Sequence, residues 1–426
     1  MFMKDRFISV LLGMLLFSLL VAGVSAWEQK IEGSVYIQSL SDDGNIGVYH
    51  KDDSDRGAEE LFTLYDKSGK KLWDYSIPTT MEAVCFSSSD NGNYHIMGYK
   101  SKNDGSSFAD YYFIYLNKDG KEQWQKTYEK ESATIGAVYA SKIANDGSFY
   151  VIRDDIRSSA HEEERRVIDR YNAKGELIYT YSDTQGEPLR FSVTNDGNTI
   201  VILAGDNVKY LNTIAGSEWT YDAPYASCVD VTGDGTYVAV GIASTTSSIK
   251  SGLIILDSSG KKICSAPTGS GHWVLTVGIT DSGEYTVISD HNDQIRCFDK
   301  SGKELWSRSG KSFELAENRP AVMIIDSTNP DKFALYSMEN VKIMEGMTQY
   351  DVARVAITKN GEYLAAGCKD YLYYYNPSYP TAGLSFSGIE SDGSTGNTAQ
   401  SAPLGLLSVI MSLAIICVLI RNRDDR

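Results

Sequence analysis

Residues 65–73 read Tyr-Asp-Lys-Ser-Gly-Lys-Lys-Leu-Trp, and residues 298–306 repeat the pattern as Phe-Asp-Lys-Ser-Gly-Lys-Glu-Leu-Trp. In each copy an Asp or Asn is followed three residues later by Gly and seven residues later by Trp or a replacement. The six copies have their glycines at Gly69, Gly120, Gly175, Gly216 (one residue late), Gly260 and Gly302, which lie 41 to 55 residues apart. Self-similarity at this period predicts a repeat architecture.

A second motif, a short apolar strand that ends in a turn with Gly, alternates with the first. Its copies are Asp43-Gly44, Asn91-Gly92, Asp146-Gly147, Asp196-Gly197, Asp234-Gly235, Ser282-Gly283 and Asn360-Gly361, and Asn329-Pro330-Asp331 fits as a degenerate eighth copy. Such turns between apolar runs indicate tight β-hairpins, because Gly accepts a positive φ. Outside the two chain ends, no apolar stripe at helical spacing is long enough for a helix.

Four short strands per unit and eight units predict an all-β fold, an eight-bladed β-propeller. A seven-bladed propeller is the alternative, and it would leave out the unit at Asn329. The last unit, which ends at Tyr375, has only three strands, whereas residues 27–31 precede the first unit and fit a fourth strand. We therefore expect this N-terminal strand to complete the last blade, so that no blade has an open edge.

The last position of the first motif is expected to pack each blade against a neighbouring blade. Burial of a large ring there is worth about 1.5–3 kcal/mol. We interpret these residues as structural blade-docking residues rather than as a platform for a cofactor or a sugar. They are Trp27, Trp73, Trp124, Tyr179, Trp219 and Trp306, with Cys264 at the same position of the fifth copy.

These motifs also carry a family resemblance. Asp66–Trp73 and Asp299–Trp306 resemble the tryptophan-docking repeat of quinoprotein-like propellers, and the apolar strand before Asp-Gly resembles the WD40 repeat. Over residues 27–376 the chain is similar to exported PQQ-binding-like or WD40-like propeller proteins of archaea and bacteria. The resemblance implies the fold but not the activity.

Quinoprotein dehydrogenases, which resemble the chain in blade motif, hold the quinone between a disulfide of adjacent cysteines and a Trp, with Ca²⁺ nearby. This sequence has no adjacent cysteine pair. Propellers of the outer-membrane assembly lipoprotein type are a comparable non-enzymatic use of the fold, although that family lacks a C-terminal membrane span.

The chain ends predict export and membrane anchoring. Basic residues, an apolar run and Val24-Ser-Ala26 indicate a signal peptide over residues 1–26, with an uncleaved anchor as the alternative. The propeller ectodomain (27–376) is followed by a Ser/Gly/Thr/Pro-rich linker (377–402), a transmembrane helix (403–420) and a basic cytoplasmic stub (421–426). The expected localisation is the cell membrane, single-pass, with the propeller extracellular or on a periplasm-like side.

The C-terminal tail has a second interpretation. It resembles the sorting tails of archaeal surface proteins, in which the span is removed, although Pro403-Leu404-Gly405 departs from their usual Pro-Gly-Phe. Both fates of the span, retention and processing, stay open at this point.

Charge and motifs disfavour nucleic-acid binding and catalysis. A formal net charge of −16 repels nucleic acid. Five widely spaced cysteines precede the predicted span; they form no Cys-x-x-Cys and fit small core residues, although one pair could bridge. The histidines lack metal-ligand spacing, and no nucleophile elbow, zinc-protease or phosphate-loop motif occurs. We expect no catalytic residue, no cofactor and no metal.

Function is therefore expected in the loops. Long loops at 51–60, 100–110, 154–166, 243–251 and 309–319 should lie on one face, either as a binding side or as tolerated loop variation. The candidate partner-binding residues are Asp52, Asp53, Asp55, Glu59, Asp154, His161, Glu163 and Arg165. We interpret the chain as a non-enzymatic binding or scaffolding module for protein or glycan partners; an extracellular quinone- or metal-dependent enzyme is the alternative.

Overall fold

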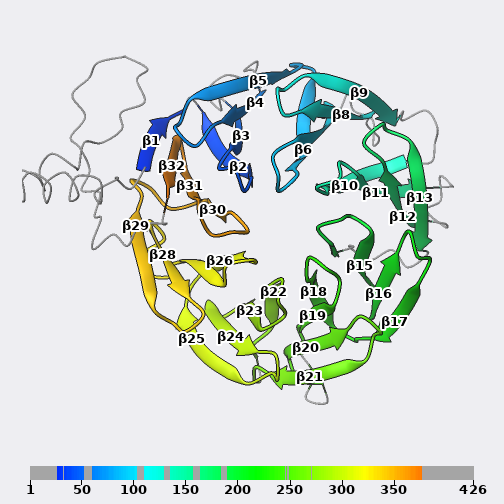
Figure 1. Ribbon diagram of the computed structural model, residues 1–426, viewed down its shortest axis with the longest axis vertical. Coiled ribbons are helices and arrows are strands. Elements are labelled where there is room, and N and C mark those ends of the chain that lie inside the picture. Colours follow the sequence, from blue (N-terminus) through cyan, green and yellow to red (C-terminus); the bar gives the residue numbers. More distant parts are fainter. Residues whose placement is uncertain are drawn as a thin grey trace, which may run out of the picture.

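The computed structural model describes residues 26–31, 33–51, 60–102, 110–128, 135–156, 164–183, 190–244, 246, 249–269 and 271–376. These residues form 32 β-strands in eight four-stranded antiparallel sheets. The sheets are arranged as blades around a central axis (Figure 1). The expectation of an all-β, eight-bladed propeller is confirmed, and the seven-bladed alternative is wrong.

The strands are numbered in chain order, and the first strand of each blade lies nearest the axis (Figure 1). Blade 1 contains β2 (Ser34–Leu40), β3 (Ile46–Lys51), β4 (Glu60–Tyr65) and β5 (Lys71–Ile77). Blade 2 contains β6 (Met81–Ser88), β7 (Tyr94–Ser101), β8 (Tyr111–Asn117) and β9 (Glu122–Tyr128). Blade 3 contains β10 (Ile135–Ile143), β11 (Phe149–Ile156), β12 (Glu164–Tyr171) and β13 (Leu177–Asp183). Blade 4 contains β14 (Phe191–Val193), β15 (Thr199–Ala204), β16 (Asn207–Asn212) and β17 (Glu218–Asp222).

The second half of the ring follows the same order. Blade 5 contains β18 (Ala226–Val231), β19 (Tyr237–Ile242), β20 (Gly252–Asp257) and β21 (Lys262–Pro267). Blade 6 contains β22 (Val274–Ile279), β23 (Tyr285–Asp290), β24 (Gln294–Asp299) and β25 (Glu304–Ser309). Blade 7 contains β26 (Ser312–Ala316), β27 (Ala321–Ile325), β28 (Lys332–Ser337) and β29 (Lys342–Met347). Blade 8 contains β30 (Arg354–Ile357), β31 (Leu364–Cys368), β32 (Tyr371–Tyr375) and, as its outer strand, β1 (Ala26–Lys30).

The pairing of β1 with β32 closes the ring. Ala26 lies opposite Tyr375, Trp27 opposite Tyr374, and Lys30 opposite Tyr371. The Trp27 ring stacks on the Tyr374 ring with 5.0 Å between centroids and 8° between planes. The expected N-terminal closing strand is therefore confirmed.

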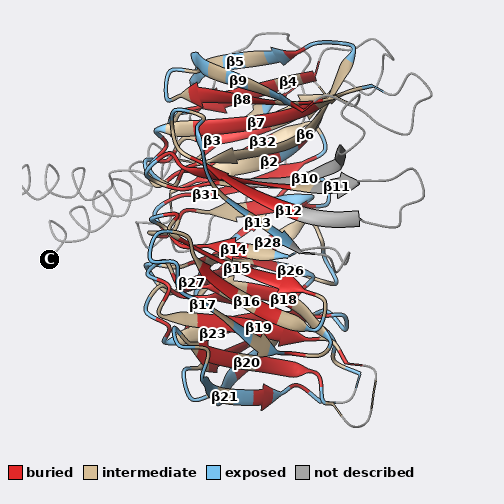
Figure 2. Cartoon of the chain, turned by 90° about the vertical axis from the view of Figure 1, so that its right-hand side faces the viewer, coloured by how far each residue is buried: buried red, intermediate tan, exposed pale blue. Residues whose placement is uncertain are grey.

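The apolar core lies between neighbouring blades. The two middle strands of a blade are nearly continuous apolar runs, and β15 (Thr-Ile-Val-Ile-Leu-Ala) is buried at every residue. Outer strands alternate instead, as in β17, because only one face is covered. Figure 2 shows buried residues concentrated in the middle strands. One cluster combines Val35, Ile46 and Val48 of blade 1 with Leu372 and Tyr374 of blade 8.

One part of the sequence interpretation is wrong in blade 7. Residues 309–319 were expected as a long loop, but they contain the inner strand β26. The inner turn of this blade is therefore 317–320, and Asn329 lies in the next turn, between β27 and β28. The assignment failed because the turn Glu-Asn-Arg-Pro has no Asx-Gly pair.

Five tryptophans dock on the blade that follows. Each indole Nε1 donates a hydrogen bond to a carbonyl oxygen in the turn between the third and fourth strands of the next blade, here called the docking turn. The pairs are Trp27 to Lys67, Trp73 to Lys118, Trp124 to Ala173, Trp219 to Ser258 and Trp306 to Met338, at 2.8–3.1 Å. A Cβ added at Gly120, whose φ is +72°, would lie 2.5 Å from the Trp73 ring, so the motif needs glycine there.

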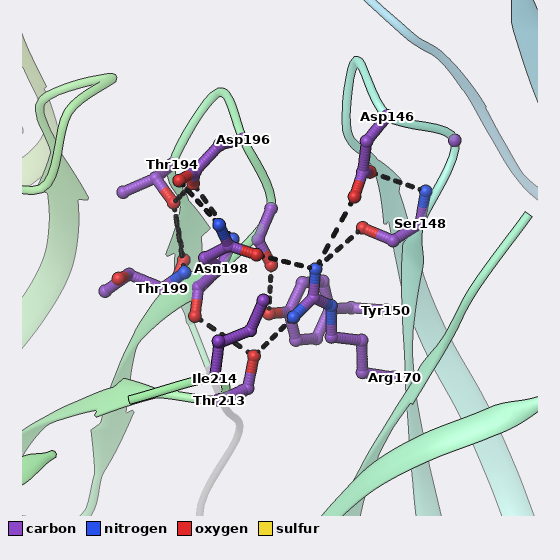
Figure 3. Close-up of polar contacts among 12 residues, drawn as sticks. Asp146, Ser148, Tyr150, Arg170, Thr194, Asp196, Asn198, Thr199, Thr213 and Ile214 are labelled. Carbon is purple, nitrogen blue, oxygen red and sulfur yellow. Dashed lines mark hydrogen bonds and ion pairs between the residues drawn. The ribbon is translucent and has the colours of Figure 1, made fainter. Parts of the chain in front are cut away.

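The junction of blades 3 and 4 uses a different contact. Gly216 has no atom within 4 Å of an added Cβ, so Tyr179 does not reach it. Instead Arg170 of β12, only 2% exposed, joins the two blades (Figure 3). It donates to Thr213 Oγ1 at 2.5 Å, and to Ser148 Oγ and Asn198 Oδ1 at 3.1 Å.

Carboxylates of both blades lie near the charge of Arg170, which lowers the pKa of Asp196 in blade 4. Asp146 Oδ2 lies 3.7 Å from the Arg170 guanidinium, and Arg170 Nε has no hydrogen-bond partner in the described part of the chain. Ser148 and Asp146 belong to blade 3, whereas Thr213 and Asn198 belong to turns of blade 4. The buried Arg170 side chain therefore joins blades 3 and 4 by hydrogen bonds, as an indole joins the two blades at each of five other junctions.

We predict that Trp306→Ala lowers the free energy of unfolding by about 3–5 kcal/mol, because a buried ring and its hydrogen bond are both lost. Trp306→Phe should recover most of the packing but not the hydrogen bond. Leu305→Ala, at an exposed neighbour, should change stability by about 0.5 kcal/mol or less. Urea unfolding measures all three; equal effects of the alanine variants would contradict the docking role.

We predict that Arg170→Met costs about 2–4 kcal/mol, since it leaves buried polar groups of two blades without their donor. Arg170→Lys should recover less than half, because one ammonium cannot reproduce the forked geometry of a guanidinium. Lys174→Ala, on the exposed docking turn of the same blade, is the matched control. Equilibrium unfolding that finds Arg170→Met as stable as the control would rule out the junction role.

Candidate interaction face and channel

The propeller has two unlike faces. The turns after the first and third strands of each blade lie on one side, here called the turn face; the loops after the second strand and the connections between blades lie on the other, the loop face (Figure 2). Ala26 and Tyr375 lie opposite each other at the turn-face end of blade 8. Both ends of the described propeller therefore leave from the turn face.

The predicted partner-binding residues lie mostly outside the described residues. This holds for Asp52, Asp53, Asp55, Glu59, His161 and Glu163. Asp154 and Arg165 belong to β11 and β12 rather than to a loop, and their role in partner binding stays a prediction. The two strands stay paired from Phe149–Tyr171 to Ile156–Glu164, so the loop between them is shorter than the sequence indicated.

Exposed aromatic and aliphatic residues lie in or just before inner strands on the loop face, around the propeller axis, a position here called the channel mouth. Tyr225, Trp273 and Tyr350 precede the inner strands of blades 5, 6 and 8, while Tyr36 and Leu275 belong to the inner strands of blades 1 and 6. Their exposed fractions run from 37% for Trp273 to 49% for Leu275. We call these five residues the rim; large exposed apolar groups gathered on one face are typical of interaction surfaces.

Two rim residues contact neighbouring side chains. Trp273 stacks on His291 with 4.7 Å between centroids, and its backbone N–H donates to His291 Nδ1 at 3.3 Å. Tyr350 lies under the Lys369 ammonium, which is 4.5 Å from the ring centroid. Such contacts reduce the conformational entropy that a side chain loses when a partner covers it.

A polar network beneath Trp273 strengthens this part of the rim. Asp290 is buried and lies 2.8 Å from His272 Nδ1 through its Oδ2. Its other oxygen accepts the backbone N–H of Asn292 at 2.9 Å. These contacts tie the connection before β22 to the turn after β23, and so fix the position of Trp273.

On the turn face, hydrogen bonds join the inner turns of successive blades around the whole ring. Six run between backbone groups: Asp42 to Asp90, Asn145 to Asn195, Asn195 to Gly233, Asp281 to Glu317, and both Asn318 and Arg319 to Lys359. Three run from a backbone N–H to a side chain: Asn91 to Asn145, Gly233 to Asp281, and Asn360 to Asp42. The last of these links blade 8 to blade 1.

Lys359 bridges this ring across the axis. Its Nζ lies 2.9 Å from Glu317 of blade 7 and 3.1 Å from Asp90 of blade 2, and it also donates to Asn195 of blade 4. Burial lowers the pKa of Lys359, but Glu317 and Asp90 outweigh that effect and hold the pKa above its ordinary value. Lys359 therefore stays charged and occupies the turn-face end of the axis.

Glu314 carries a carboxyl without a partner. It belongs to β26, and its side chain has no hydrogen bond or ion pair with any residue that the structure describes. Burial raises its pKa to about 7; Arg354 opposes the rise, and Glu317 adds to it. The ionised form is therefore destabilising in the folded protein.

The sequence interpretation did not identify the rim, Lys359 or Glu314. A signal for Lys359 was available: it occupies the position where other inner turns have Asp42, Asp90, Asn145, Asn195 and Asp281. For the rim, the signal was an aromatic residue just before several inner strands. No sequence pattern distinguishes Glu314 from other carboxylates, because its surroundings come from three blades.

The described residues contain no disulfide. Their five cysteines are free thiols, and Cys228, Cys297 and Cys368 are buried. No group of three or more His, Cys, Asp or Glu side chains in this part of the chain is placed to hold a metal ion. None of the described segments forms a helix long and apolar enough to cross a membrane.

We predict that Glu314→Gln stabilises the protein at pH 8 and leaves it nearly unchanged at pH 4.5. The folded pKa lies above the ordinary value of 4.5, so wild-type stability falls as pH rises from about 4.5 through 7. The amide removes this loss, which amounts to about 1–3 kcal/mol. Urea unfolding at both pH values measures it.

Glu284→Gln, at an exposed carboxylate on the turn face, is the control and should change stability by about 0.5 kcal/mol or less at either pH. A gain for Glu314→Gln of equal size at both pH values would contradict the assignment.

Comparison with known proteins supports the fold alone. BamB from Moraxella catarrhalis has a similar structure, with a TM-score of 0.52 and 14% sequence identity over 83% of this chain and 98% of that one. No protein-family model and no curated protein sequence matches the chain. The chain is thus an eight-bladed β-propeller similar in fold to BamB, with a rim of exposed aromatic residues on its loop face.

Proposed function

We propose that the protein is a non-enzymatic binding module that holds a protein partner on its loop face. The observation that carries the proposal is the rim: Tyr36, Tyr225, Trp273, Leu275 and Tyr350 are each exposed, in or just before inner strands on the loop face. Tyrosine and tryptophan dominate the energetics of protein interfaces.

The turn face offers a weaker surface to a partner. Its inner turns are occupied by hydrogen bonds between blades, and its Asp side chains bond within their own turns, as Asp234 does with Thr232 and Thr236. Polar groups that already have partners gain little from a new one. The rim, in contrast, exposes apolar surface, and its removal from water by a partner would lower the free energy of the complex.

The second part of the proposal is a membrane tether. The signal peptide and the C-terminal span are sequence predictions that lie outside the described residues. Both described ends leave from the turn face. An anchor at either end would therefore direct the loop face away from the membrane, toward a partner.

The test removes apolar area from the rim. The variant Trp273→Ser, Leu275→Ser, Tyr350→Ser is made in the full-length chain. Its control is Leu72→Ser, Ile214→Ser, Leu305→Ser, which removes exposed apolar groups of the docking turns and outer strands (44%, 71% and 41% exposed). Both proteins are cross-linked in the cells that make them, and cross-linked proteins are quantified by mass spectrometry.

We predict that proteins cross-linked to the wild type fall about tenfold or more with the rim variant and remain with the control, since a central aromatic anchor is worth about 2 kcal/mol or more. Retention of every partner by the rim variant would overturn the proposed binding face. An equal loss of cross-linked proteins in both variants would also overturn it, because the loss would then not depend on the rim.

A further inference from the structure

A small cavity lies beside the propeller axis, among the inner strands that form what is here called the channel wall. Its volume is about 160 Å³, and it is lined by three neighbouring inner strands: β2 through residues 37–40, β26 through Glu314, and β30 through residues 354–357. Figure 1 shows β30 between β26 and β2 at the axis. At about 30 Å³ per water, the cavity holds roughly five waters or a comparably small organic molecule.

The charged groups of this cavity are unpaired. Neither Glu314 nor Arg354 makes an ion pair or a side-chain hydrogen bond with any residue in the described part of the chain. The Gln38 side chain has no hydrogen-bond partner there either. At the turn-face end of the axis, by contrast, Lys359 is paired with Glu317 at 2.9 Å. Lys359 and Glu317 thus form an ion pair, whereas Arg354 and Glu314 line a cavity without forming one.

Gln38 lies at a backbone irregularity of a kind that the inner strands of blades 2, 3, 5 and 6 also have. The register of β2 against β3 shifts between Ile37 and Ser39, which makes Gln38 the extra residue of a β-bulge. Bulges re-aim side chains and occur often at functional sites. Arg354 is exposed and stands at the loop-face end of β30, so a ligand can reach the cavity from the channel mouth.

Glu314 and Arg354 interact electrostatically without forming an ion pair, so each leaves its charge available to a ligand group of opposite sign. A ligand with one charge would leave the other residue unpaired, whereas a ligand with both would pair each of them. We propose that the cavity binds a small zwitterion of the free amino-acid type, with its carboxylate on Arg354, its ammonium on Glu314, and Gln38 as an additional polar partner.

This ligand also relieves an energetic cost. Burial raises the pKa of Glu314 to about 7, so the empty cavity disfavours the ionised carboxyl. A bound ammonium stabilises that ionised form. The site is independent of the rim: a protein partner on the loop face and a zwitterion in the channel wall are separate binding events.

The test measures ligand binding by the full-length protein, purified in detergent, with isothermal titration calorimetry at pH 8. Glycine is the probe, and acetate and methylammonium each supply only one of its two charges. Glycine should bind with a dissociation constant of about 1 mM or tighter, whereas each single-charge probe should bind at least tenfold more weakly. Glu314→Gln and Arg354→Gln should each weaken glycine binding at least tenfold.

Glu284→Gln, on the turn face, is the matched control and should bind glycine as the wild type does. Thermal unfolding checks that the variants remain folded. No binding of glycine up to 10 mM would overturn the proposal, as would equal affinity for acetate or wild-type affinity in both channel variants. The rim variant described above should bind glycine normally, which separates this test from that of the binding face.

Discussion

The structure depends on closure of the ring by β1, the strand that precedes the first complete blade. Its pairing with β32 supplies the missing outer strand of blade 8, and Trp27 docks from it onto blade 1. A propeller without this strand would present an open edge and an uncovered apolar surface between its first and last blades. The other seven junctions join consecutive blades along the chain, whereas this junction joins the two ends of the propeller.

Closure divides the molecule into a structural face and a free face. The turn face is occupied by docking turns, by the hydrogen bonds between inner turns and by Lys359. The loop face has no comparable ring of contacts among the described residues, and the rim aromatics are exposed there. The proposed protein partner would bind at the channel mouth, and the proposed zwitterion would bind in the channel wall.

The repeats predicted the fold because each copy contains the residues that its own turns and docking contacts require. Asx-Gly requires a tight turn, and the Gly of the docking turn leaves room for an indole. Prediction failed where such residues were absent: the turn 317–320 lacks Asx-Gly, and Asp154 and Arg165 extend strands through a segment whose charge suggested a loop. Arg170 could not be identified either, because its partners belong to the next blade.

The candidate sites were less predictable than the fold. Gln38, Glu314 and Arg354 meet only when blades 1, 7 and 8 come together, so their shared cavity has no sequence pattern. The rim left a weak signal, an aromatic residue before an inner strand, which becomes meaningful only once the inner strands are placed around one axis.

Native-state hydrogen exchange tests the central claim of closure most directly. If β1 is an integral strand of blade 8, the hydrogen-bonded amides of Glu28–Lys30 should exchange as slowly as those of Leu372–Tyr374 in β32, since both open only when the ring opens. Exchange of the β1 amides within seconds, while the β32 amides stay protected, would contradict closure by the N-terminal strand.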